Sequence, residues 1–360
     1  MSGRPRRILA LAGLAALCAC SQPALPAAHV LPPDSGAARA ARSYAAQNDI
    51  PPRLQWEAND GYCGEVSTIS AGLYYGQYVS QYDARAIASP GVPQYEASSQ
   101  LLLDANDRTA ATAMHLTWEE WKADGPSPKK FLAWVERQVA LGHPVAIGVY
   151  NNEYLLYGKT GPQAGSVSYD HIVPVVAVTS SRPLDGSYDP SAVLTFSDNG
   201  LWGTHGNYPY LFRYAFGSFQ RTRKEANARR GPLYGLPDRI RNYGIAITGI
   251  VDDSKETLPV RVATSLNYER PSIVNGTSKR PAPMPLVLTA TVSGLTPGVR
   301  YRLYRYDGFS SVPDGEFNAR AAAAAQRWTF SIASGSTYSL SQRVMSDQEV
   351  IYRAVPAAAP

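Results

Sequence analysis

Cysteine is the residue type that this chain has least of. The 360 residues contain three cysteines, Cys18, Cys20 and Cys63. The first two lie in an N-terminal segment with the pattern of an export signal, so Cys63 is expected to be the only cysteine of the mature protein. One cysteine in an exported chain has no partner for an intramolecular disulfide. Its thiol therefore stays free, pairs with another chain, or acts as a nucleophile.

Long apolar runs are also lacking beyond the N-terminus. Residues 8–19 form an uncharged apolar run behind three arginines, and this run is too short to span a bilayer. Residues 17–20 resemble a bacterial lipobox with Cys20 as the lipidated residue, and cleavage of a plain signal peptide near residue 28 is the alternative. Both interpretations place the protein outside the cytosol, as a periplasmic, outer-membrane lipoprotein or secreted protein. Membrane contact is expected only through a lipid anchor.

Neither charge sign dominates the chain. The formal net charge is +5, and three of the positive charges are arginines of the first twenty residues. The densest basic stretch, residues 221–230, is interrupted by Glu225 and is typical of a solvated surface. We therefore expect no nucleic-acid partner. Glycine-rich phosphate loops and closely spaced Cys or His ligands are also lacking, so we expect no cofactor and no metal.

The distribution of apolar residues divides the chain into four segments. Residues 1–28 form the signal, and residues 29–50, rich in Ala, Pro, Ser and Arg, form a linker. Residues 51–252 combine helical and strand spacing, whereas residues 253–360 show mainly strand spacing. The sequence therefore predicts an α+β fold, in which a helix and an antiparallel sheet are followed by an all-β sandwich.

Helical spacing over residues 64–76 places Cys63 at a helix N-terminus. A second helix is predicted from Ser127-Pro128 to Gly142. Strands are predicted at residues 145–150, 169–178 and 193–197. Because Pro174 has no N–H to donate, it indicates an edge or a bulge in the second of these strands.

The C-terminal segment contains a strand, a turn and a strand over residues 286–304. The turn at residues 294–298, followed by Tyr301, resembles that of fibronectin type III and immunoglobulin-like sandwiches, where a tyrosine closes a corner. Residues 321–325 are expected to form a short helical insertion. The segment has no histidine or cysteine, so we expect it to supply no catalytic group.

Cys63 needs a partner to act as a nucleophile. A helix N-terminus and a nearby imidazole both favour the thiolate, so we expect a lowered pKa. His171 is the preferred partner because it begins a buried strand, where the backbone holds an imidazole rigidly. A buried histidine bonded to a backbone carbonyl is the alternative interpretation. The other histidines have simpler explanations: His29, His115, His143 and His205.

A catalytic imidazole usually has a third group that fixes its orientation. Asp170 is adjacent to His171, but neighbours on a strand point to opposite faces. Asp198 and Asn199 end the next predicted strand, and we prefer Asp198. The alternative is that residues 197–200 form an ordinary turn.

These residues resemble the papain-like cysteine peptidase superfamily, especially the branch of double-glycine leader peptidases. Four elements carry the resemblance, in the family's order: Cys63-Gly64, Leu141-Gly142-His143-Pro144-Val145, Asp170-His171-Ile172-Val173 and Ser197-Asp198-Asn199. The family scheme has an oxyanion-binding glutamine about six residues before the cysteine. This chain has Gln55 eight before and Asn59 four before, and we prefer Gln55, acting beside the Cys63 amide.

The resemblance implies an exported thiol hydrolase that cleaves an amide bond of a peptide or protein substrate through an acyl-enzyme. Cys63 would be the nucleophile, His171 the proton shuttle, and Asp198 or Asn199 the orienting group. An acyltransferase or transamidase with the same residues is one alternative. A non-catalytic binding or adhesion protein on a papain-like scaffold is the other, since fold does not imply function.

Overall fold

The computed structural model describes residues 43–51, 53–122, 125–151, 169–200, 211–221, 233–238, 241–266 and 275–357. The predicted signal with Cys18 and Cys20 lies outside these residues, as does His205. The described secondary structure mixes helices with antiparallel sheets, in agreement with the expected α+β class. None of the helices in these stretches combines the length and apolarity that a membrane span requires.

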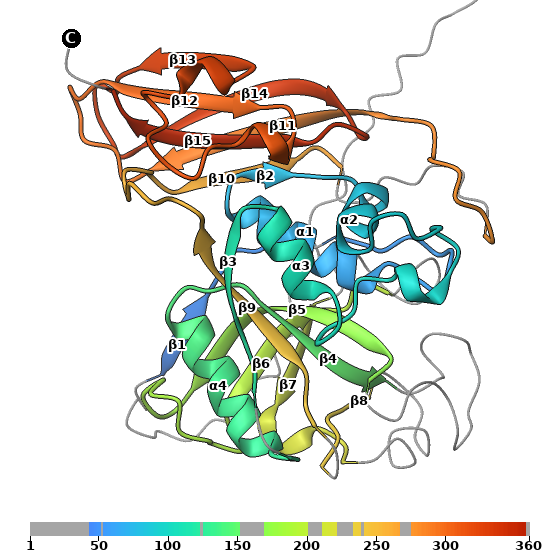
Figure 1. The fold of residues 1–360 in the computed structure, drawn as a ribbon. Coiled ribbons are helices and arrows are strands. Elements are labelled where there is room, and N and C mark those ends of the chain that lie inside the picture. The colour runs from blue at the N-terminus through green and yellow to red at the C-terminus, as the bar shows by residue number, and fades with distance from the viewer. Residues whose placement is uncertain are drawn as a thin grey trace, which may run out of the picture. The chain divides into compact units, whose positions relative to one another are not determined.

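The helical elements lie mainly in the first half of the chain (Figure 1). The described α-helices are α1 (Cys63–Tyr74), α2 (Gln81–Ala88), α3 (Asp107–Ala113) and α4 (Pro128–Ala140), and the short 3₁₀ turns are Ala97–Ser99, Phe216–Ser218, Phe309–Ser311 and Ala321–Ala323. α1 begins at Cys63, and α4 has Pro128 in its first turn, as the sequence predicts. The insertion expected at residues 321–325 is a single 3₁₀ turn.

The main sheet is antiparallel throughout. Its order is β3 (Leu116–Glu120), β9 (Gly244–Ile250), β4 (Val145–Asn151), β5 (His171–Ser180), β6 (Val193–Ser197) and β7 (Leu211–Ala215), with β1 (Tyr44–Gln47) paired to β5 and β8 (Tyr234–Gly235) paired to β4. Residues 43–50, the described end of the predicted linker at residues 29–50, contain β1, whose backbone pairs with the second half of β5; residues 29–42 lie outside the described residues. Alanine-rich composition did not reveal this pairing, which depends on a partner strand far along the chain.

β5 is buried on both faces of this sheet. Ile172 packs into the apolar cluster that contains α1, whereas Val173 and Val175 pack into the cluster that contains α4. The two helices therefore cover opposite faces of the strand, as side-chain alternation requires. The pairing of β5 with β6 shifts register between Val175 and Ala177, next to Pro174, where the sequence indicates an edge or bulge.

The C-terminal strands form two further sheets. One has the order β10 (Val260–Thr264), β11 (Pro285–Ser293), β14 (Thr337–Met345); the other has the order β13 (Gln326–Phe330), β12 (Tyr301–Tyr306), β15 (Val350–Pro356), β2 (Gln77–Tyr78). Alternate residues of β11 are buried in the same apolar cluster as residues of β12 and β15. The Thr296 N–H donates to the Tyr301 hydroxyl (2.8 Å), which fastens the turn before β12.

β2 joins the N-terminal part of the chain to a C-terminal sheet. Its two residues pair with Val350 and Ile351 of β15, and Nη2 of Arg353 donates to Gln77 Oε1 (3.1 Å). Residues 42–360 accordingly form one compact unit. The boundary predicted near residue 252 falls inside this unit, and the independence of its two sides stays a prediction.

Candidate active site

Cys63 lies at the first residue of α1, with a free and half-buried thiol. The N–H groups in the first turn of a helix have no acceptor within the helix itself. Together with the helix dipole they favour negative charge at this point. The local sequence therefore places the sulfur at the positive end of the α1 dipole.

A left-handed turn leads into the helix. Asn59, Asp60 and Gly61 have φ values of 48°, 63° and 86°. Asn and Asp tolerate this conformation better than most residues, and glycine adopts it freely. A Cβ atom at Gly61 would lie 3.0 Å from Oε1 of Gln55, so glycine also permits this close approach.

Arg85 of α2 fixes the same turn from the other side. Its guanidinium donates to the carbonyl oxygens of Asn59 (3.0 Å) and Gly61, and it stacks on the Tyr62 ring at 3.6 Å. Its Nε donates to Oε1 of Glu65, in the first turn of α1, at 2.6 Å. Arg85 and Glu65 are both almost fully buried, so this ion pair ties α2 to the turn and to the helix start.

The peptide group between Gly61 and Tyr62 is consequently held at both ends. Arg85 binds its carbonyl oxygen, and the Tyr62 N–H donates to Oε1 of Gln55 (2.9 Å). Because Oε1 accepts this hydrogen bond, Nε2 of Gln55 is the end of the amide that faces away from the turn. Gln55 can donate to an oxyanion beside Cys63 only if Nε2 points toward the cysteine.

His171 lies beside Cys63 at the start of β5 and is buried. Its Nε2 is 2.9 Å from Oδ1 of Asp198, which leaves Nδ1 for the sulfur. Burial lowers the pKa of His171, but the Asp198 carboxylate and the hydrogen bond with Cys63 outweigh burial and raise that pKa to about 10. The imidazole therefore lies between the Asp198 carboxylate and Cys63, and this position favours its protonated form.

Asp198 follows β6 and is fully buried. Oδ1 accepts from His171 and from the Gly200 N–H (2.9 Å), and Oδ2 accepts from the Tyr234 hydroxyl (2.5 Å). Burial raises the pKa of Asp198, but the charge of His171 and these three hydrogen bonds outweigh it, so the net shift is downward. Burial and the neighbouring carboxylate raise the pKa of Tyr234, which stays a neutral donor. Nothing in the sequence singled out Tyr234, which β8 brings here.

Asn199 occupies a different position from Asp198. Its Nδ2 donates to the carbonyl oxygens of Cys63 (3.1 Å) and Ile172 (3.1 Å) and to Oγ of Ser67 (3.2 Å). The backbone carbonyl of Asn199 accepts a hydrogen bond from the Gln55 N–H at 2.8 Å. Of the two residues predicted to orient His171, Asp198 is thus the one bonded to the ring, while Asn199 joins the helix start to β5 and to Gln55.

The two residues predicted as oxyanion donors, Gln55 and Asn59, have different surroundings. A Cβ atom at Gly200 would lie 2.9 Å from Nε2 of Gln55 and 2.9 Å from Cε1 of His171. The two side chains therefore lie close together at Gly200, where any larger residue would clash with both. The side chain of Asn59 instead accepts from the Gly276 N–H (2.8 Å) and donates to the carbonyl of Thr277 (3.1 Å). Gln55 lies at the site, and Asn59 anchors its turn to residues 276–277.

The two remaining described histidines have other partners. Nδ1 of His143 is 2.7 Å from Oε1 of Gln138, and Nδ1 of His115 is 3.1 Å from Oδ1 of Asp314. Within the described stretches, no group of three His, Cys, Asp or Glu side chains is arranged to hold a metal ion.

Comparison with known proteins adds no relative to this geometry: neither the scan against protein-family models nor the search of curated proteins found a match.

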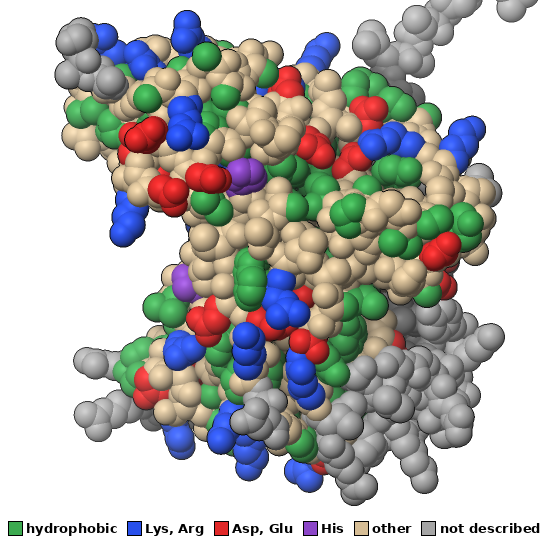
Figure 2. Space-filling view, viewed as in Figure 1, with side chains coloured by type: hydrophobic (Ala, Val, Ile, Leu, Met, Phe, Trp, Pro, Cys, Tyr) green, Lys and Arg blue, Asp and Glu red, His purple; other side chains and the backbone are tan. Residues whose placement is uncertain are grey.

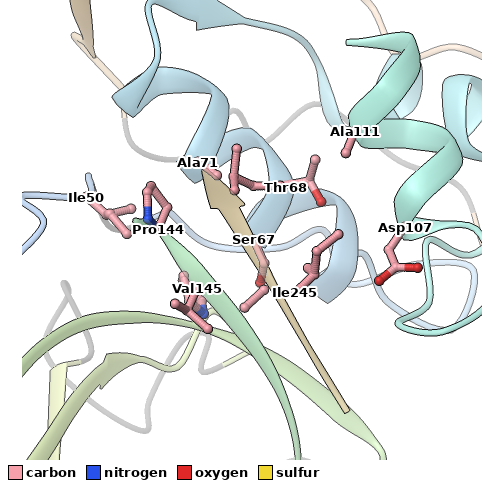
Figure 3. Close-up of a pocket in the computed structure, with 12 residues that line it drawn as sticks. Ile50, Ser67, Thr68, Ala71, Asp107, Ala111, Pro144, Val145 and Ile245 are labelled. Atoms are coloured by element: carbon pink, nitrogen blue, oxygen red, sulfur yellow. The ribbon is translucent and has the colours of Figure 1, made fainter. Parts of the chain in front are cut away.

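A small cavity lies behind α1, close to the site. Its volume is about 10 Å³, and it lies between α1, α3, β4 and β9. Figure 3 shows Ser67 and Thr68 of α1 on one side and Asp107 of α3 on another. Space of this size holds at most one water molecule. The notable group is Asp107, since burial and then the nearby Glu120 raise its pKa to about 6.

Asp107→Asn is expected to change how stability depends on pH. Folding raises the pKa of Asp107 from 3.8 to about 6. Between pH 4 and pH 6 the native state therefore binds more protons than the unfolded state, and wild-type stability falls as pH rises through that window. The variant avoids this loss, so its stability relative to wild type increases by roughly 2–3 kcal/mol from pH 4 to pH 7. Urea unfolding at both pH values measures this, with exposed Asp253→Asn as control; a constant difference contradicts it.

Proposed function

We propose that this chain is an exported thiol hydrolase of the papain-like cysteine peptidase superfamily, which cleaves an amide bond of a peptide or protein substrate. One observation carries the proposal: Cys63 begins a helix and contacts His171, whose other ring nitrogen is 2.9 Å from the buried carboxylate of Asp198. This nucleophile, base and orienting group meet from three separate elements. A role in folding alone does not require a free thiol beside a protonated imidazole.

In the first half of the reaction, Cys63 passes its proton to His171, and the resulting thiolate attacks the carbonyl carbon of the scissile bond. The carbonyl oxygen becomes an oxyanion, for which the Cys63 N–H and Nε2 of Gln55 are the proposed donors. His171 then gives its proton to the leaving nitrogen as the C–N bond breaks, and an amine departs. The acyl group is left on sulfur as a thioester.

In the second half, water replaces the amine. His171, now neutral, removes a proton from water as the oxygen attacks the thioester carbon. The C–S bond breaks, the carboxylic acid leaves, and the sulfur and imidazole return to their starting state. Asp198 stabilises the imidazolium in both halves, and Tyr234 and the Gly200 N–H hold Asp198 in place.

Gln55→Glu tests the proposed oxyanion donor. The new side chain keeps an oxygen for the Tyr62 N–H but replaces the Nε2 donor by a second acceptor with negative charge. We expect kcat for a peptide substrate to fall about 10²–10³-fold. Asn59→Ala is the matched control, since that side chain bonds residues 276–277, and it should leave kcat within a few fold in folded protein. Equal losses in the two variants would contradict the assignment.

An acyltransferase with the same residues differs only in the second half, where an amine of an acceptor attacks the thioester. A binding protein on this scaffold would form no acyl-enzyme. Incubating the mature chain with a peptide substrate, with and without added amine, separates the three by mass spectrometry: acid product, amide product, or neither. The arrangement of Cys63, His171 and Asp198 supports catalysis over binding alone, and water as the simplest acceptor.

The export and partner assignments also belong to this proposal. The N-terminal pattern supports export as a periplasmic, secreted or Cys20-lipidated outer-membrane protein. Lys and Arg side chains are spread over the face in Figure 2 with Asp and Glu among them. This mixed charge on the described part of that face suits a peptide or protein substrate better than nucleic acid.

A further inference from the structure

A second cavity lies at the opposite end of α1 from Cys63. Its volume is about 480 Å³, within the range of small-molecule sites. Tyr74 and Tyr75 at the C-terminal end of the helix line it, roughly 17 Å along the helix axis from the cysteine. Other lining residues come from the turn after α4, the end of β9, and β10, β11 and β15. The cavity thus lies where the main sheet meets the C-terminal sheets, a common place for ligands.

The charged side chains among the described residues that line this cavity have one sign. The described residues that line it include Arg261 and Arg353 but neither Asp nor Glu. Arg261 stacks on the Tyr74 ring at 4.2 Å, and its Nη1 forms an exposed ion pair with Asp49 at 3.2 Å. Asp49 is not part of the lining. The surroundings therefore favour a ligand with negative charge.

Arg353 is the unusual member of this lining because it is 1 % exposed. Nη1 donates to the carbonyl oxygens of Tyr75 (3.3 Å) and Tyr352 (2.9 Å), and Nη2 donates to Gln77. Nε has no partner among the described residues, and no described carboxylate forms an ion pair with this side chain. A guanidinium binds carboxylates well because several N–H donors point the same way. The carbonyl of Tyr75 belongs to the negative end of the α1 dipole, which Arg353 partly offsets, and Arg261 adds a second positive charge.

The remaining walls are aromatic and aliphatic. Tyr74 and Tyr75 are the aromatic residues at the helix end that line the cavity, and Leu258 and Val260 are aliphatic residues of the lining. Leu141, also in the lining, is 62 % exposed. Apolar walls with a few placed polar groups are typical of cavities that enclose the body of a small ligand and orient its charged end.

We propose that this cavity binds a small organic carboxylate with an aromatic or aliphatic body. Arg261 would contact the carboxylate beside the Tyr74 ring, and the buried positive charge of Arg353 behind the wall would add to the attraction. The site is separate from Cys63 and does not depend on the proposed hydrolase activity. A free amino acid derivative or the C-terminal residue of a peptide has this chemistry.

Calorimetric titration of the full mature chain with N-acetylphenylalanine tests the proposal. The matched probe is N-acetylphenylalanine amide, which has the same body without the charge. We expect the carboxylate to bind at least tenfold more tightly at low salt, and this preference to shrink as salt screens the arginines. Equal affinities, or no binding of either probe at millimolar concentration, would overturn it.

Two variants locate the binding. Arg353→Gln is expected to remove the preference for the carboxylate. Because Arg353 also joins β15 to the end of α1, Ser293→Phe provides an independent test that fills the cavity while leaving both arginines in place. A folded Ser293→Phe chain that still binds as wild type would place the ligand elsewhere. Protein with Cys63 blocked by iodoacetamide should bind normally; loss of binding after blocking would assign the ligand to the cysteine site and overturn the proposal.

Discussion

His171→Ala is expected to reduce turnover of a peptide substrate by about 10³-fold or more, which approaches the loss caused by Cys63→Ala. One side chain gives the proton to the leaving amine and removes the proton from water, so both halves of the reaction fail together. Because the three residues act as a unit, adding Cys63→Ala to His171→Ala should cost almost nothing further. Initial rates of the single and double variants measure this.

The alkylation rate of Cys63 gives a second measurement that needs no substrate. The protonated imidazole stabilises a thiolate, so His171→Ala should slow the reaction with iodoacetamide at neutral pH. His115→Ala is the matched control, since its partner is Asp314. In His171→Ala the buried Asp198 carboxylate loses its partner, so circular dichroism is needed to check that this variant is folded. A His171→Ala chain that is folded and nearly as active as wild type would exclude this residue as the base.

Asp198→Ala should cost less than His171→Ala. The imidazole keeps its contact with Cys63 but loses the carboxylate that orients it and favours its protonated form. Asn199→Ala removes hydrogen bonds to Cys63 and Ile172 instead, so its main effect should be on stability. A large loss of kcat in Asn199→Ala, with a small one in Asp198→Ala, would reverse these two roles.

The sequence predicted features that depend on local pattern. The helix that begins at Cys63 and the strand that begins with His171 follow from apolar spacing, which reports which faces are buried. Asp198 was predicted because it ends the strand next along the chain, and antiparallel neighbours in sequence often pair in space. Local periodicity and short connections are what a single sequence records best.

Other features depend on contacts between distant residues and were predicted only in part: the sequence favoured Gln55 over Asn59 but did not reveal the turn that separates them. Gln55 and Asn59 are similarly close to Cys63 in sequence. The left-handed turn at residues 59–61 leaves no periodic signal, yet Gln55 lies near His171 and Asn59 bonds residues 276–277. Tyr234 reaches Asp198 from a two-residue strand, too short for alternation to reveal. Arg85 resembles an ordinary surface arginine until the fold buries it.

Arg85→Met is the prediction with the largest expected effect on stability. Methionine fills similar space but has no charge, so Glu65 stays buried without its cation, and the carbonyls of Asn59 and Gly61 lose their donors. Removing one partner of a buried ion pair costs about 3–5 kcal/mol, whereas replacing both partners costs far less. We therefore expect Arg85→Met to lower the free energy of unfolding by about 3–5 kcal/mol, measured by urea denaturation at pH 7.

The double variant Arg85→Met/Glu65→Gln separates charge from shape. Glutamine still presents an oxygen to the Leu101 N–H, which Glu65 accepts at 3.1 Å, so only the unpaired charge disappears. If the buried charge dominates the loss, the double variant should regain at least half of it. Arg320→Met is the control, because Arg320 and Glu316 form an exposed ion pair, and it should cost about 1 kcal/mol or less. A single-variant loss below about 1 kcal/mol would contradict this account and would show that the turn before Cys63 keeps its shape without Arg85.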